Sequence, residues 1–363
     1  MMAILQAVVA YLAIRWSIGQ SRRMRPHLLA FLFALLPLPA ISLVHAETPF
    51  RETNGVSYAP LRPSATDPAI KEYDDPHWIY VQRHIVVDHD ASLPADRQQL
   101  LLWIPGTKPP DAKAPEPGRV VRGSSHNFCL MAASLGYHAI ALSYPNLHSA
   151  SACNNDAETK AFENFRLSII QGGTSPHITI SRTDSIENRL IKVLQALAQR
   201  APKEGWDSFL NADGSIRWEK IAVAGQSQGG GHAALIGVHH KVARVVCFGA
   251  PKDYSIALKA PAAWYDTKSE TPKELFFAFN HQQDRQGCTP EHQIDNLRAL
   301  KLDAFGPPTL VDEASPPYQK SHILMTNYPG TAVSSMVAHG TMISPANAER
   351  FGEVWKYMLT STP

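Results

Sequence analysis

The stretch Ile221-Ala-Val-Ala-Gly-Gln-Ser-Gln-Gly-Gly-Gly-His232 decides the fold. Its first four residues predict a short buried strand, and the small residues at its end open a helix. Between them lies Gly225-Gln226-Ser227-Gln228-Gly229, a G-x-S-x-G sequence that is typical of a nucleophile elbow when it joins a strand to a helix. Gly225 and Gly229 fit this sharp turn because a side chain at either position would collide across it. Ser227 is therefore the predicted nucleophile.

The first 46 residues are expected to be a signal peptide, with Met24 as an alternative start. Residues 28–44 supply an apolar run, and Val44-His45-Ala46 is a small-x-small cleavage site. A retained anchor and, from Ser21-Arg22-Arg23, a twin-arginine signal are the alternatives. We expect an exported protein, periplasmic or secreted, with no stable membrane span after cleavage.

Size and charge indicate one large enzyme domain. The chain has 363 residues, 44% of them hydrophobic, and a formal net charge of +2. Four arginines lie in the first 46 residues, and removing them leaves 30 basic and 32 acidic residues. Since no basic patch remains, no nucleic-acid partner is expected.

If the protein is exported, its four cysteines can form disulfides, because the compartment outside the cytoplasm is oxidising. Cys153 lies in a polar loop, and we expect it to be bridged to Cys129 or Cys288. Cys247 lies within an apolar stretch and is expected to be buried in a central strand.

Short apolar strands alternate with helices along the chain. Residues 47–76 are expected to form a surface arm, and 77–363 the main domain. The predicted strands are 77–88, 98–104, 138–144, 221–224, 242–248, 274–279 and 323–326, and the predicted helices include 125–136, 185–201 and 346–359. This alternation predicts an α/β fold with a mostly parallel, doubly wound sheet and helices on both faces.

With the elbow set in this pattern, residues 77–360 resemble the α/β-hydrolase superfamily. The closest likeness is to a branch of exported bacterial hydrolases that carry a Ser-Gln-Gly-Gly-Gly-His elbow. The resemblance implies an order along the chain: the nucleophile, then an acid after a later strand, then a histidine near the carboxyl terminus. It also implies cap-like insertions in the loops, for which 146–183 and 254–271 are the candidates.

The resemblance points to His339 as the base and Asp284 as the acid. His339 is expected in the loop that follows the strand at 323–326 and precedes the last helix, whereas His322 sits at the start of that strand. Asp284 follows the strand at 274–279. Asp253, one strand earlier, is the rival acid. The acid would orient the imidazole and stabilise the imidazolium.

An oxyanion hole would use two backbone N–H groups, those of Gln228 and Thr107. Thr107 is chosen because Pro105-Gly106-Thr107 stands where many members of the superfamily carry His-Gly-x. Tyr144, Trp264 and Tyr265 are the candidate walls of a substrate pocket. No metal or other cofactor is expected, since His239, His240 and His281 lack a carboxylate cluster or an H-E-x-x-H motif.

These residues predict an exported serine hydrolase, most simply a carboxylic-ester hydrolase that acts on a small-molecule or polymeric ester. An amide or peptide hydrolase uses the same triad and is the first alternative. A hydrolase-fold binding protein without activity is the second. The fold by itself does not name the substrate.

Overall fold

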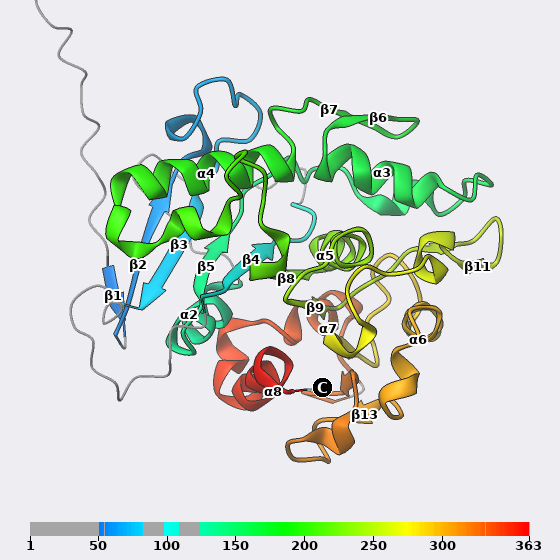
Figure 1. The fold of residues 1–363 in the computed structure, drawn as a ribbon. Coiled ribbons are helices and arrows are strands. Elements are labelled where there is room, and N and C mark those ends of the chain that lie inside the picture. Colours follow the sequence, from blue (N-terminus) through cyan, green and yellow to red (C-terminus); the bar gives the residue numbers. More distant parts are fainter. Residues whose placement is uncertain (1–50, 54, 83–97, 109–123, 331, 363) are drawn as a thin grey trace, which may run out of the picture. The chain divides into compact units, whose positions relative to one another are not determined.

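In the computed structural model, one ten-stranded sheet organises the chain (Figure 1). The structure describes residues 51–53, 55–82, 98–108, 124–330 and 332–362, so the predicted signal peptide and its cleavage site lie outside the described residues. The strands are β1 (Arg51–Thr53), β2 (Val56–Leu61), β3 (His77–Gln82), β4 (Leu100–Ile104), β5 (His138–Ala141), β6 (Gly173–Ser175), β7 (Ile178–Ile180), β8 (Ile221–Gln226), β9 (Arg244–Phe248), β10 (Tyr254–Ser255), β11 (Ala260–Pro261), β12 (Phe276–His281), β13 (Thr309–Leu310) and β14 (Ile323–Thr326). The helices are α2 (His126–Ser134), α3 (Ala161–Ile170), α4 (Ile186–Arg200), α5 (Gln228–His239), α6 (Pro290–Ala299), α7 (Ser335–Thr341) and α8 (Ala348–Thr360).

The strand order is β1-β2-β3-β5-β4-β8-β9-β12-β14-β13. All neighbours from β5 to β13 run parallel, whereas β1, β2 and β3 pair antiparallel at one edge and β3 also pairs antiparallel with β5. The predicted doubly wound, mostly parallel sheet is therefore confirmed. Because strands β4, β8, β9, β12 and β14 are parallel, their carboxyl ends meet at one edge of the sheet, where ligands bind in open α/β folds.

Alternate residues of the central strands enter two separate cores. In β4, Leu100, Leu102 and Ile104 pack on the side covered by α3, α4, α5 and α6, while Leu101 and Trp103 pack under α2 and α8. Figure 1 shows α4 and α5 on one side of the sheet and α2 and α8 on the other. A parallel strand buried on both faces is apolar at nearly every position, which is why these strands lack polar alternation.

Two segments carry more structure than the sequence predicts. Residues 47–76 are predicted as a surface arm, but β1 and β2 within them extend the sheet edge. Residues 146–183 are predicted as a loop, but they contain α3 and the β6–β7 hairpin. Among the described residues, no helix is both long and apolar enough to cross a membrane.

The predicted disulfide at Cys153 is wrong in this structure, because all four cysteines are free thiols. Cys129 packs in the core under α2 and Cys153 in the core on the opposite face, so the sheet separates them. The Cys153 thiol donates to the Ala161 carbonyl at 3.6 Å, and burial raises its pKa to about 12. Cys153 therefore serves as a buried apolar residue. Cys247 is buried in β9, as predicted.

Candidate active site

Ser227 stands alone between β8 and α5, in the sharp turn that the sequence predicts. Its φ of 56° and ψ of −123° are strained for a residue with a side chain, and its N–H donates to the Phe248 carbonyl at 2.8 Å. A Cβ at Gly225 would lie 2.6 Å from the Ile104 carbonyl oxygen, and one at Gly229 2.5 Å from that of Pro105. The close approach to the end of β4 therefore requires both glycines.

His339 and Asp284 meet beside this turn. The His339 Nδ1 lies 2.8 Å from the Asp284 Oδ2, and the Asp284 side chain is completely buried. The Gln226 amide donates to the His339 carbonyl at 3.2 Å, which ties the histidine to the residue that precedes Ser227. His339 lies within the short helix α7, not in the loop predicted from the sequence. The serine, the aspartate and the histidine, which come in that order along the chain, thus lie at one edge of the sheet.

Lys252 joins the same pair, although no sequence pattern singles it out. Its Nζ donates to the Asp284 Oδ2 at 2.7 Å and to the Gln286 carbonyl at 2.6 Å, and it lies 3.3 Å from the His339 Nδ1. Burial raises the pKa of Asp284, but the hydrogen bond from His339 and the charge of Lys252 outweigh it, so the pKa lies below its ordinary value. Burial lowers the pKa of Lys252, although Asp284 opposes the shift.

The rival acid, Asp253, is bound elsewhere. Its carboxylate accepts from the Arg166 Nε at 2.6 Å and Nη2 at 2.5 Å, and from the Trp264 Nε1 at 2.9 Å. Arg166 in turn donates to the Gln228 carbonyl at 2.9 Å, and its guanidinium occupies the space that a side chain at Gly231 would need. Asp253 therefore supports the start of α5 and does not contact His339. His322, the other late histidine, stacks on Phe277.

The loop after β4 lies against the elbow, as an oxyanion hole requires. A Cβ at Gly106 would be 3.1 Å from the Ser227 Cβ, and the Thr107 hydroxyl donates to the Gln228 Oε1 at 3.2 Å. The Ala150 N–H donates to the same oxygen at 2.8 Å. Gln228 is the first residue of α5, where a backbone N–H has no acceptor within the helix. Gln228 and Thr107, the predicted donors, are thus brought together.

The three predicted pocket residues are buried supports. Tyr144, Trp264 and Tyr265 are each at most 2% exposed. The Tyr144 hydroxyl donates to the Pro105 carbonyl at 2.9 Å, and the Tyr265 hydroxyl accepts from the Asp253 N–H at 2.9 Å. Their polar atoms face the protein, so they fix the loops around Ser227 and do not line an open pocket in this structure.

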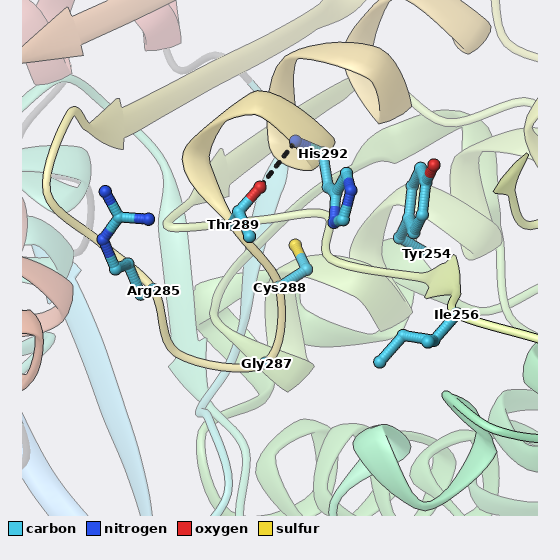
Figure 2. A pocket seen from close by; sticks show the side chains of 7 residues that line it. All are labelled: Tyr254, Ile256, Arg285, Gly287, Cys288, Thr289 and His292. Carbon is cyan, nitrogen blue, oxygen red and sulfur yellow. Dashed lines mark hydrogen bonds between the residues drawn. The ribbon is translucent and has the colours of Figure 1, made fainter. Parts of the chain in front are cut away.

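A small cavity opens beside the loop that follows Asp284 (Figure 2). The cavity has a volume of about 220 Å³ and is lined by Tyr254, Ile256, Arg285, Gly287, Cys288, Thr289 and His292. The Tyr254 and His292 rings are stacked, with centroids 3.6 Å apart, and Figure 2 shows them side by side. The cavity borders the loop that carries the acid, but Ser227 does not line it. In the part of the chain that the structure describes, no cluster of three or more histidine, cysteine or carboxylate side chains is placed to hold a metal ion.

The topology and this site decide the fold. The serine follows the central strand β8, the acid follows β12, and the histidine follows β14, all at the carboxyl edge of a parallel sheet. The chain has the α/β-hydrolase fold.

Comparisons with known proteins give distant structural likenesses. No family model matches the chain, and no curated protein does. An S-formylglutathione hydrolase from Agrobacterium tumefaciens is similar at 12% identity and a TM-score of 0.44, over 86% of this chain and 99% of that one. Esterase B from Lactobacillus rhamnosis is similar at 14% identity and a TM-score of 0.36, over 85% of this chain and 86% of that one. An α/β-hydrolase enzyme from a deep-sea metagenome library is similar at 15% identity and a TM-score of 0.34, over 69% and 78%.

Proposed function

We propose that this protein is a serine hydrolase that cleaves carboxylic esters through an acyl-enzyme on Ser227. The observation that carries the proposal is the 2.8 Å contact between His339 and Asp284, held beside the elbow by the hydrogen bond from Gln226 to His339. A buried carboxylate on Nδ1 fixes the tautomer in which Nδ1 carries the proton. The free Nε2 then serves as the base for the serine hydroxyl.

The proposed reaction uses two matched proton transfers. The Ser227 Oγ bonds to the ester carbonyl carbon while its proton passes to the His339 Nε2, and the carbonyl electron pair moves onto the oxygen. The N–H groups of Gln228 and Thr107 stabilise that oxyanion. The intermediate collapses, the C–O bond to the alcohol breaks, and the alcohol leaves with the proton from His339. Water repeats the sequence on the acyl-enzyme and releases the acid.

The test combines active-site labelling with substrate profiling. Wild-type protein is expected to react with a fluorophosphonate at Ser227 and to hydrolyse p-nitrophenyl esters of graded acyl length faster than the matching anilides. Ser227→Ala and His339→Ala should each lower turnover by a factor on the order of 10⁶, by analogy with other triads. Ser134→Ala, on the exposed side of α2, is the matched control. Folded wild-type protein that neither labels nor turns over any ester would refute the proposal and favour a silent binding protein.

We also propose that the protein is exported, because the sequence has an apolar run followed by a cleavage site at Ala46. Expression of the full chain in a bacterium should yield a periplasmic or secreted protein whose amino terminus is Glu47. Recovery of the intact chain in the cytoplasm alone would contradict it.

A further inference from the structure

Lys252 is a third charged group in contact with the histidine–aspartate pair. It follows β9 in the loop 249–253, and its side chain is only 10% exposed. The Asp284 Oδ2 and the Gln286 carbonyl accept from its Nζ at 2.7 Å and 2.6 Å, and both contacts hold the ammonium in place. A buried lysine so restrained cannot be an ordinary solvated surface charge.

The ammonium competes with the imidazole for one carboxylate oxygen. The Asp284 Oδ2 accepts from both His339 Nδ1 and Lys252, while its Oδ1 accepts from the Gln286 N–H at 2.9 Å. The Lys252 Nζ lies only 3.3 Å from the His339 Nδ1, and a positive charge at that distance opposes a second positive charge on the ring. The site therefore differs from a pair of histidine and aspartate alone by a fixed cation beside the ring.

Cys288, Asp253 and Arg285, which lie on the loops that carry Lys252 and Asp284, do not cancel the effect. Burial raises the pKa of the Cys288 thiol, which faces Lys252, to about 12, so the thiol is neutral. The Asp253 carboxylate is occupied by Arg166, and Arg285 is an exposed cation. Gly249, which packs against both Asp284 and His339, has no charge.

We propose that Lys252 is a positioning residue that extends catalysis toward lower pH, because its ammonium, 3.3 Å from the His339 Nδ1, repels a second positive charge on that ring. The inference rests on the proposed function of Ser227 and His339. A general base must be unprotonated to accept the serine proton, so a cation beside it extends the working range toward lower pH.

The test compares the pH profiles of kcat/KM for wild type, Lys252→Met and Lys252→Arg, with a p-nitrophenyl ester followed at the isosbestic wavelength of the product. Lys252→Met is expected to move the acid limb up by about one pH unit or more. Lys252→Arg keeps the charge and should leave the limb near its wild-type position. An unmoved acid limb in Lys252→Met would overturn the inference, as would an arginine variant that shifts as far as the methionine variant. Lys252→Gln replaces Lys252→Met if the latter does not fold.

A second readout separates this inference from the proposed function. In a Ser227→Ala background, protonation of the His339 ring is followed by carbon-13 NMR, with and without Lys252→Met. The midpoint should rise by the same amount as the acid limb. If wild type shows no hydrolysis but the midpoint rises, the proposed function fails and the role of Lys252 stands. If wild type is active and neither quantity changes, the role of Lys252 fails alone.

Discussion

Asp253 and Asp284 are buried carboxylates on neighbouring loops. An asparagine at position 253 should chiefly lower stability, whereas one at position 284 should chiefly lower turnover. Asp253 accepts three hydrogen bonds, two of them from Arg166, and both side chains of this pair are 1% exposed. Asp253→Asn leaves the guanidinium buried without a counter-charge, which costs about 3–5 kcal/mol of unfolding free energy. At roughly 2–4 °C per kcal/mol for a domain of this size, the melting temperature should fall by about 10 °C.

Asp284→Asn should chiefly affect turnover. The amide no longer fixes the Nδ1–H tautomer of His339, so kcat should fall by roughly 10⁴. The loss of stability should be smaller than for Asp253→Asn, because Lys252 keeps its bond to the Gln286 carbonyl and can release its proton.

The assay measures kcat for an ester and the thermal midpoint on the same preparations, at a temperature where Asp253→Asn remains folded. We expect Asp253→Asn to keep turnover within about tenfold of wild type, since Arg166 still contacts the Gln228 carbonyl. If Asp253→Asn loses turnover by 10⁴ with an unchanged midpoint, while Asp284→Asn is nearly as active as wild type, the assignment of the acid is wrong.

Three further outcomes follow from buried groups. Gly231→Ala should cost about 1–3 kcal/mol in chemical unfolding, because its Cβ would overlap the Arg166 guanidinium, whereas Gly352→Ala in α8 should cost little or add stability. Burial, and then the charge of Arg189, lower the pKa of His77 to about 3, so its contribution to stability is full above pH 6.5 and declines as the pH falls toward 3. Between pH 7 and pH 4.5, His77→Gln should therefore lose less unfolding free energy than wild type, by at most about 2.7 kcal/mol; an equal loss would contradict the buried neutral ring. Denatured, unreduced protein should titrate as four thiols with a maleimide, and a count of two would restore the predicted bridge.

The parts of the site that the sequence predicts are those fixed by local chemistry or by order along the chain. The glycines around Ser227 fit one sharp turn between a strand and a helix. In a parallel sheet, residues that follow neighbouring strands lie at the same edge, as Asp284 and His339 do. The two residues meet at 2.8 Å for that reason. The central strands are also predictable from the sequence, because the side chains on both of their faces are apolar.

What the sequence does not predict depends on contacts between distant segments. In the sequence, nothing distinguishes Lys252 from other lysines in polar loops. Only the fold brings Asp284 into contact with it. Arg166 lies in a segment without a clear apolar period, yet it packs against Gly231 and pairs with Asp253. The strand β2 carries Pro60 near its end, which is more typical of irregular structure. However, β1 pairs only with residues 56–58 of β2, so β2 is an edge strand at Pro60, where proline is tolerated. The sequence does not indicate whether the aromatic side chains of Tyr144, Trp264 and Tyr265 face a pocket or the protein interior.

The position of Gln228 has a consequence for when the proposed hydrolase becomes competent during synthesis. Its side chain binds Thr107, which lies 121 residues earlier, and Ala150, 78 residues earlier, while His339 lies 113 residues after Gln226. No part of the chain short of α7 contains a complete site, and closure of such long loops comes late in folding. If the proposed function holds, a ribosome-bound fragment that already displays the elbow serine should be inert toward esters, and the chain should acquire its reactivity only when nearly all of its sheet is in place.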